Sequence, residues 1–332
     1  MTATRPSVAP VIDNTWFEAI PSAENARPVA KIWRGIWRHN ALQALAYASE
    51  RLGQPLPELR AAVTNLDLNQ RLSPRLFARL AALMEAMQRS DRYAIYDLIQ
   101  AWCSDPRETW TTDRICTESI AVHSWEHDLL TEVRGTHVTN AAPFSLFPLL
   151  ETQLTPLQAA VEEALGRIEC VDQGMHAEIQ EHVALIKLFQ GPGVEGFSSP
   201  KAFGAIWLQM PQPGRELAWF LEHLVHECSH LHLNALLALD PLLLNPNEHH
   251  QAPIRPDPRP LFQVLHGTFV LARNCRVHRR LISQWPDLGL EATLREFEAQ
   301  LARGVSVLQS HMQPTPRGQG LLLSLQAEVE GS

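Results

Sequence analysis

The stretch from Glu216 to Asp240 constrains this chain more than any other part of the sequence. It contains the pattern H-E-x-x-H, formed by His226, Glu227 and His230. Residues four apart on a helix lie on one face, with about 5–6 Å between their Cβ atoms, so both imidazoles can reach one metal ion. The pattern therefore predicts a helix that carries two metal ligands.

The residues around this motif predict a long, buried helix. Pro213-Gly214 precede it and Pro241 follows it, with no helix breaker between them. Leucine, valine and phenylalanine surround the polar positions on nearly every side, which is typical of a core helix. A buried imidazole needs a partner, and a metal ion is the simplest partner for two of them at this spacing. Two core histidines satisfied by hydrogen bonds are the alternative interpretation.

The composition is that of an ordinary globular protein. Of the 332 residues, 45% are hydrophobic and 19% are charged, which argues against a disordered chain. The net charge of −8 argues against a broad nucleic-acid-binding surface. The five cysteines are scattered without a C-x-x-C pair, which fits a reducing compartment. We find no apolar signal-peptide core and no apolar run long enough to span a membrane, so we expect a cytoplasmic protein.

Apolar periodicity predicts a mainly α fold with a minor β element. Helical spacing runs through the ranges 29–53, 56–68, 74–89, 92–103, 113–133, 155–170, 175–190, 260–282 and 290–308, with a short element at 321–325. The apolar run at 205–208, with turn residues on both sides, is the best strand candidate. The turn-rich segment 135–143 predicts a boundary between a helical amino-terminal region, 1–140, and an HExxH metal-binding catalytic domain, 141–332.

A catalytic metal site needs a third protein ligand and open coordination positions. The metzincin pattern is excluded, because leucine occupies positions 233 and 236, where that pattern needs Gly and His. Glu248 lies at about the distance that the gluzincin pattern requires, but in a loop between prolines. His266 is the strongest candidate, because it lies early on the next apolar helix and the following Gly267 leaves room for close approach. A core histidine hydrogen-bonded to the backbone is the alternative interpretation of His266.

Several other histidines are weaker candidates as metal ligands. Near the motif these are His223, His232, His249 and His250. A second pair, His123 and His127, also lies four apart, but it lacks the Glu directly after the first His. Its neighbour Glu126 favours a solvated helix face, so we interpret this pair as surface or structural histidines.

Three blocks of sequence together resemble a known family. They are HECSHLHLNALLALDPLL at 226–243, the end of a proline-rich loop, RPDPRPL, at 255–261, and LHGTF at 265–269. In this combination they are similar to the HExxH-type peptide-maturation proteins, described as α-ketoglutarate-dependent peptide β-hydroxylases of ribosomal peptide natural product pathways. The similarity is best between residues 197 and 281, and the amino-terminal part matches only in being helical.

The resemblance implies an iron(II) site that uses 2-oxoglutarate and O2 to hydroxylate the β-carbon of a residue in a precursor peptide, with or without contacts to its leader segment. His226, His230 and His266 would bind the metal and leave positions for a bidentate 2-oxo acid and oxygen. Glu227 would hold an orienting role outside the metal's own ligands. Its side chain lies about 100° round the helix from His226, which makes direct ligation awkward.

The distal carboxylate of 2-oxoglutarate requires a cationic anchor, and the planar fork of arginine suits a carboxylate best. The candidates are Arg255, Arg259 and Arg273. The first two flank the P-D-P segment before the second helix of the site, and the third lies on that helix. Ser198 and Ser199 are the candidate substrate-binding residues, because the FSSP segment could pair with an extended peptide by strand addition.

Two other functions fit the motif. A zinc metallopeptidase would use Glu227 as the general base, although a conventional third ligand is missing. Such an enzyme usually stabilises the oxyanion with a tyrosine or histidine, and the three tyrosines all lie in the amino-terminal part. A non-catalytic peptide-binding module would keep the motif as structural support. Both enzymes predict an open metal position, whereas the binding module predicts a closed or empty site.

Overall fold

The computed structural model describes residues 12–121, 125–127, 129–131, 145–254 and 257–331. The structure is 65% helical, which confirms the mainly α prediction. The α-helices are α1 (Ala23–Leu52), α2 (Pro57–Thr64), α3 (Pro74–Gln88), α4 (Arg92–Cys103), α6 (Glu151–Val171), α7 (Gln173–His182), α8 (Glu216–Leu237), α9 (Leu261–Gln284), α10 (Glu291–His311) and α11 (Pro316–Glu330). Short 3-10 helices are η1 (Asn14–Phe17), η2 (Arg107–Thr109), η3 (Pro200–Ala202) and η4 (Pro286–Leu288).

Four strands form one mixed sheet. They are β3 (Cys116–Ser119), β4 (Leu185–Phe189), β5 (Gly196–Ser198) and β6 (Ala205–Gln209), in the order β3-β4-β6-β5. Strands β3, β4 and β6 run parallel to one another, and the edge strand β5 runs antiparallel to β6. Two small antiparallel pairs join β1 (Arg71–Leu72) to β2 (Thr111–Thr112), and β7 (His249–Gln251) to β8 (Pro258–Pro260). The sheet supplies the minor β element, and β6 confirms the strand predicted at 205–208.

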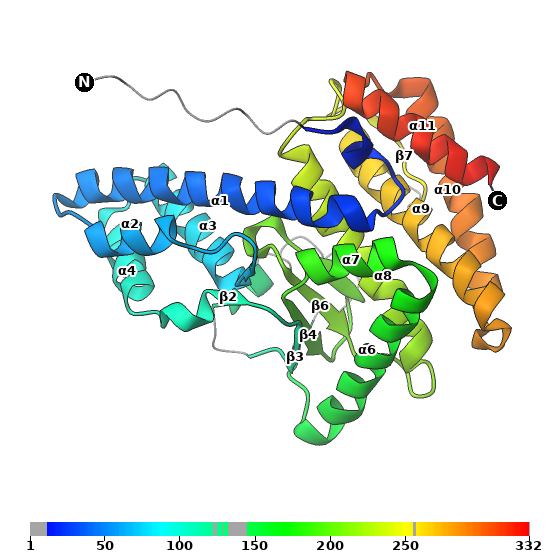
Figure 1. The fold of residues 1–332 in the computed structure, drawn as a ribbon, viewed down its shortest axis with the longest axis horizontal. Helices are drawn as coiled ribbons and strands as arrows, with labels where there is room; N and C mark the ends of the chain where they lie inside the picture. The colour runs from blue at the N-terminus through cyan, green and yellow to red at the C-terminus, as the bar shows by residue number, and fades with distance from the viewer. Residues whose placement is uncertain (1–11, 122–124, 128, 132–144, 255–256, 332) are drawn as a thin grey trace.

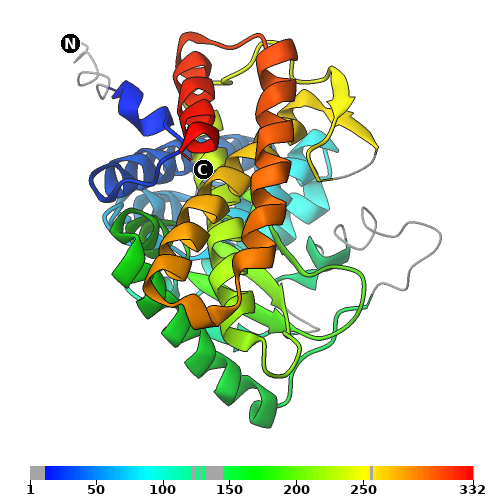
Figure 2. The same cartoon turned by 90° about the vertical axis from the view of Figure 1, so that its right-hand side faces the viewer.

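The helices lie on both sides of this sheet. Figure 1 shows α1 to α4 extending to one side, α9 to α11 on the other, and α6 to α8 beside the strands. Figure 2 shows α9, α10 and α11 as a neighbouring group that runs along the molecule. Within the described residues, every helix is too short or too polar to cross a membrane.

Local sequence signals set several helix ends, although α1 begins at Ala23 and not at the predicted residue 29. The Ser22 side chain accepts a hydrogen bond from the backbone N–H of Asn25 at the start of α1. Gly53 ends that helix in the left-handed conformation, with φ of 71°. Pro74 occupies the first turn of α3, where its missing N–H costs nothing. The last element is longer than the predicted 321–325, because Thr315 caps a full helix, α11.

Two predicted helices are wrong in part, and both errors lie at the sheet. The range 175–190 contains a helix only to His182, and β4 follows from Leu185. The range 113–133 contains β3. A short apolar run fits a helix or a buried strand equally well, so its pairing partners decide. Those partners are distant in sequence, since Cys116 pairs with Leu185.

The sheet crosses the predicted domain boundary at residue 140. That boundary lies among residues outside the described structure, but β3 before it pairs with β4 after it. Helix α1 packs against α7 and α8, and one hydrophobic core includes buried residues from both predicted parts. The larger hydrophobic core therefore contains residues from both sides of the predicted boundary.

Glu126 is buried, although the sequence favoured a solvated face. Its side chain is 0% exposed and lies 2.7 Å from the Lys187 ammonium on β4. It also accepts a hydrogen bond of 2.8 Å from the indole of Trp207 on β6. A buried carboxylate is tolerated when a cation and a donor satisfy it, and only the sheet brings these together. His127 is exposed, and His123 lies outside the described residues.

A buried ion pair ties α7, α9 and the start of the chain together. The guanidinium of Arg273 donates to both carboxylate oxygens of Glu178 on α7 and, over 3.0 Å, to the carbonyl of Ala19. The same guanidinium lies 4.3 Å from the ring centre of Phe269. The side chains of the pair are 0% and 2% exposed, so each charge depends on the other.

We predict that Glu178→Gln lowers the free energy of unfolding by about 3–5 kcal/mol, because it leaves the buried Arg273 charge unpaired. Denaturant unfolding of the metal-free protein measures this. Glu163→Gln is the matched control, because its ion pair with Arg167 is exposed and contributes less than about 1 kcal/mol. Equal losses in the two variants would contradict the prediction.

Candidate metal centre

Helix α8 holds the H-E-x-x-H motif in the middle of the protein. It packs against α9, α6, α7 and strand β5, so most of its side chains are buried. It begins after Gly214, whose φ of 80° turns the chain, and it ends before Pro241. This confirms the predicted core helix, with His226 and His230 on one face.

The structure brings His226, His230 and His266 into one row of rings. The Nε2 atoms of His226 and His230 are 3.2 Å apart, and the Nδ1 atoms of His230 and His266 are 3.4 Å apart. Two nitrogen ligands at ordinary bond lengths from one ion are separated by about 3.0–3.4 Å. The first pair therefore has the separation of two ligands that share a metal ion.

The third histidine contacts the pair from its other side. His230 presents Nε2 to His226 and Nδ1 to His266, so the three rings do not yet converge on one point. Accordingly, no group of three or more His, Cys, Asp or Glu side chains in the described part of the chain has the arrangement of a finished metal site. Rotation of the His230 or His266 ring about its side-chain bonds is the adjustment that three-ligand binding requires.

Burial keeps all three imidazoles neutral at ordinary pH. It lowers the pKa of His226 to about 3 and the pKa of His266 to about 4. The pKa of His230 lies well below its usual range because of burial and its two histidine neighbours. Neutral imidazole is the form that binds a metal, so the donor set fits a divalent transition metal such as iron(II) or zinc.

Glu227 lies on a different side of α8 from the two histidines, against the edge strand β5. Burial raises its pKa to about 7, and a hydrogen bond with the Ser198 side chain partly offsets this. A Cβ on Gly196 would lie only 3.1 Å from Oε1 of Glu227, so glycine makes room for the carboxyl group. The other oxygen, Oε2, is buried without a hydrogen-bond partner. Such an oxygen is available to a water molecule, a metal-bound group or a substrate.

These groups face a cavity of about 590 Å³, which is large enough for a small cosubstrate and a side chain. The lining includes Ser198 and Glu227 at strand β5, and Ile254, Arg259 and Phe262 from the loop before α9 and its first turn. Ile254 and Phe262 are 51% and 37% exposed, respectively, so part of the lining is apolar and open. The cavity thus combines an apolar wall with a few polar groups, which is the usual character of a binding site.

Only some of the predicted arginine anchors lie at the cavity. Arg259 lines the cavity and forms an ion pair of 2.7 Å with Asp257. Arg273 does not line it, because its guanidinium is buried against Glu178 about two helical turns beyond His266. Arg273 lies on the same helix as His266, but its ion pair with the buried carboxylate keeps the side chain out of the cavity. Arg255 lies outside the described residues.

Of the two predicted substrate-binding serines, one lines the cavity and the other does not. Ser198 lines the cavity and contacts Glu227. Ser199 accepts a hydrogen bond from the backbone N–H of Lys201 and caps the short helix η3, so it does not line the cavity.

The weaker ligand candidates do not line the cavity. They are His223, His232, Glu248, His249 and His250. His223 stacks on Trp219 with 3.7 Å between ring centres. His232 contacts His182 over 2.9 Å, on another side of α8. Glu248 accepts a hydrogen bond from Asn245 in the loop after α8.

Sequence reasoning missed two carboxamides of the cavity, Asn234 and Gln263. Asn234 follows His230 by four residues, and Gln263 precedes His266 by three. The same helical spacing that selected the histidines would have placed both residues on the site face.

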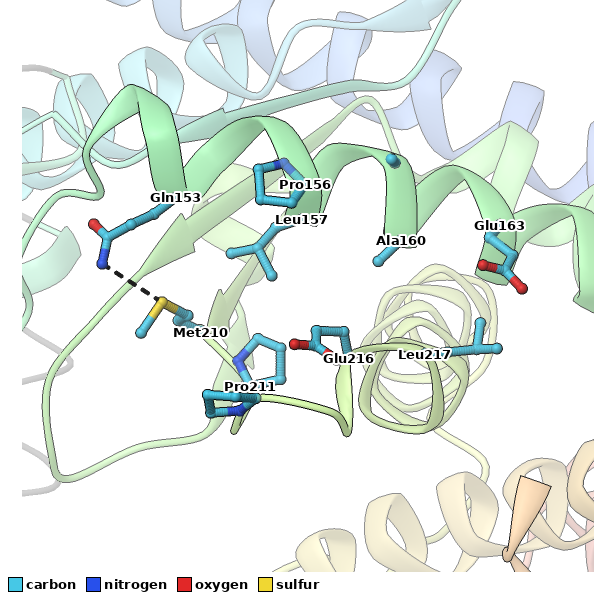
Figure 3. A pocket seen from close by; sticks show the side chains of 11 residues that line it. Gln153, Pro156, Leu157, Ala160, Glu163, Met210, Pro211, Glu216 and Leu217 are labelled. Carbon is cyan, nitrogen blue, oxygen red and sulfur yellow. Dashed lines mark hydrogen bonds between the residues drawn. The ribbon is translucent and has the colours of Figure 1, made fainter. Parts of the chain in front are cut away.

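A second cavity lies between α6 and the start of α8 (Figure 3). It has a volume of about 490 Å³ and is lined largely by aliphatic and proline side chains. Its polar groups include Gln153, which contacts the sulfur of Met210, and the carboxylates of Glu163 and Glu216. It contains no histidine or cysteine among its lining residues, so its donors do not fit the metals that the first cavity suits.

Comparison with known proteins does not assign this arrangement to a group. No protein-family model matches the chain, and no curated protein matches it significantly. The chemistry of the site therefore rests on the residues themselves.

We predict that the wild-type protein binds one iron(II) or zinc ion per chain. His226→Ala and His230→Ala should abolish stoichiometric binding, and His266→Ala should weaken it, because each removes a nitrogen donor. Calorimetric titration and metal analysis after gel filtration measure this. His249→Ala, an exposed histidine outside the cavity, should bind like the wild type. Full binding by His230→Ala would show that the metal is held elsewhere.

The metal-free protein should lose stability as the pH falls from 6.5 towards 4. Unfolded histidines take up protons near pH 6.5, whereas folded His226 and His266 stay neutral to about 3 and 4, respectively. The unfolded state therefore binds more protons in this range, at a cost of up to about 1.4 kcal/mol per pH unit for each such histidine.

Denaturant unfolding at pH 7.5, 6.5 and 5.5 measures this dependence. The double variant His226→Gln, His266→Gln should show a smaller loss between pH 6.5 and 5.5 than the wild type. Equal losses would mean that these histidines are not the groups responsible.

Proposed function

We propose that this protein is an iron(II)- and 2-oxoglutarate-dependent oxygenase of the cytoplasm that hydroxylates the β-carbon of a residue in a ribosomally made precursor peptide. The observation that carries the proposal is the contact of three neutral histidines from two helices in a cavity that also holds an arginine. When bound, iron(II) with 2-oxoglutarate and O2 supplies the oxidation of an unactivated C–H bond. The resemblance of the motif blocks to the HExxH-type peptide β-hydroxylases supports the same function.

The histidines would hold the ion without changing its charge. His226, His230 and His266 are neutral donors, so an iron(II) ion keeps two positive charges. That charge favours chelation by an anionic 2-oxo acid. A shell of three protein ligands also leaves open positions for it.

Arg259 is the described candidate for the distal carboxylate of the 2-oxo acid. It lines the cavity, and its guanidinium already pairs with a carboxylate, that of Asp257. The Asp257 side chain is 53% exposed, so water can solvate it if the arginine turns to a new partner. A guanidinium can grip a carboxylate with two parallel hydrogen bonds, which fixes orientation as well as charge.

Strand β5 offers an edge to an extended peptide. The backbone N–H of Gln209 donates to the carbonyl of Glu195 over 2.7 Å, so Glu195 and Phe197 face β6. By the alternation of an antiparallel pair, the backbone groups of Gly196 and Ser198 point away from β6. Both residues line the cavity, so a peptide that paired with them would pass beside the histidines.

One observation favours a zinc metallopeptidase as the second candidate. Glu227 has a pKa of about 7 and a buried oxygen without a partner, which suits a general base near neutral pH. The tyrosines, however, lie on α1 and α4, away from the cavity lining: Tyr47, Tyr93 and Tyr96. A peptidase of this kind would need another donor to stabilise the oxyanion.

The deciding experiment compares metals in one assay. Protein purified without oxygen is loaded separately with iron(II) or zinc, then given 2-oxoglutarate and O2, and succinate is measured. We expect succinate from the iron form alone, lost in His266→Ala and retained in His249→Ala. Arg259→Met should raise the KM for 2-oxoglutarate about tenfold or more, because it removes a charged hydrogen-bond donor.

The opposite pattern would support the other enzyme. Cleavage of a denatured casein or a peptide mixture by the zinc form, lost in Glu227→Gln and without succinate from the iron form, would identify a metallopeptidase. Metal binding without either product would contradict both proposals.

A further inference from the structure

Two side-chain carboxamides occupy one end of the metal cavity. Asn234 lies on α8 and Gln263 on α9, and both line the same cavity as the histidines. Each is about one helical turn from a histidine on its own helix, since Asn234 follows His230 by four and Gln263 precedes His266 by three. Residues at these spacings share a helix face, so both carboxamides face the cavity.

The antiparallel packing of α8 and α9 brings the two carboxamides to the same level. Trp219 and Glu222 near the start of α8 line a small cavity with Leu290 and Thr293, where α10 begins just after α9 ends. The end of α9 therefore lies beside the start of α8. The two helices therefore run antiparallel, so residues after His230 on α8 lie on the same side of the histidines as residues before His266 on α9.

The contact between His230 and His266 fixes the register of the two helices. Their Nδ1 atoms are 3.4 Å apart, so these two residues lie opposite each other. Asn234 lies about 6 Å further along α8, and Gln263 about 4.5 Å back along α9, at 1.5 Å per residue. Both carboxamides thus lie about one turn beyond the histidine pair, in the same direction along the two helices.

Both carboxamides are available to a ligand. Within the described residues, the side chain of neither Asn234 nor Gln263 makes a hydrogen bond; Asn234 is half-buried, and Gln263 is exposed at the mouth of the cavity. By contrast, Asn245 bonds Glu248 and the carbonyl of His311, and Gln209 bonds the carbonyl of Gly191. A half-buried carboxamide that faces a cavity costs free energy unless a ligand or water satisfies its N–H and C=O groups.

We propose that Asn234 and Gln263 form a clamp for one main-chain amide of the peptide substrate. A carboxamide carries donors and an acceptor, so it complements the N–H and C=O of a peptide group. The cationic Arg259, in the same cavity, is the better partner for a carboxylate. The clamp rests on the proposed peptide substrate and determines specificity by holding that amide one turn from the histidines.

A binding experiment without turnover tests the clamp. Full-length protein loaded with cobalt(II) is titrated with N-acetyl-leucine N-methylamide or with the matching methyl ester, which lacks one N–H. Relaxation enhancement of the probe protons by cobalt gives each Kd. We expect the wild type to bind the amide about fivefold more tightly than the ester, the size of one neutral hydrogen bond.

The double variant Asn234→Leu, Gln263→Met keeps the side-chain sizes and should bind amide and ester equally. Gln43→Met, at an exposed position of α1, is the matched control and should keep the fivefold preference. If the double variant does not fold, the single variants Asn234→Ala and Gln263→Ala should each reduce the preference. Cobalt content and circular dichroism confirm that the variants tested are intact.

Three outcomes would overturn the clamp. They are no amide preference in the wild type, an unchanged preference in the variants, and a tenfold weaker Kd for 2-oxoglutarate in the variants. The last would mean that the carboxamides bind the cosubstrate. The result is separate from the proposed oxygenase activity, because absence of succinate would remove that activity while amide preference lost in the double variant would still support the clamp.

Discussion

The packing of α8 against α9 is the contact on which the candidate site depends. It places His230 opposite His266, with 3.4 Å between their Nδ1 atoms, and so adds a third imidazole to the pair that α8 carries alone. A slip of one helical turn would move His266 by about 5 Å, beyond the reach of a metal bound by His226 and His230. The register of two helices thus decides whether the cavity has two candidate metal ligands or three.

The surrounding structure holds that register. On the far side of α8, Glu178 and Arg273 form a buried ion pair that links α7 to α9. His232 Nδ1 lies 3.5 Å from the same Glu178 carboxylate, so α8 contacts this network as well. Buried charges are costly unless paired, so one arrangement of the three helices is favoured over its neighbours. The network is therefore positioned to hold the histidines without touching the cavity.

The cavity contains a titratable carboxyl group in one region and neutral carboxamides in another. Glu227 and Ser198 lie against strand β5, while Asn234 and Gln263 lie one turn beyond the histidine pair on the helices. The carboxyl group of Glu227 has a pKa of about 7 and can therefore exchange a proton near neutral pH, whereas the carboxamides stay neutral donors and acceptors. The peptide substrate that we propose would thus meet proton-exchanging and purely positioning groups at different points along its chain.

The sequence by itself determined the features that depend on short spacing. It determined the buried helix α8, the shared face of His226 and His230, the end of α1 at Gly53, the start of α3 at Pro74, and the strand at 205–208. These follow from local geometry, because a helix or strand repeats within a few residues. His266 was selected by its place on the next apolar helix, and the structure brings it into contact with His230.

Only the tertiary structure decided which distant groups meet. It turned residues 185–189 into a strand, buried Glu126 beside Lys187, and directed Arg273 to Glu178 and away from the cavity. The strand at 185–189 pairs with residues 20 and 69 positions away, and the two buried charges have partners more than 60 residues away in the sequence. Local periodicity says which face a side chain shares, but the partner that satisfies a buried charge or strand is chosen by the packing of the whole chain.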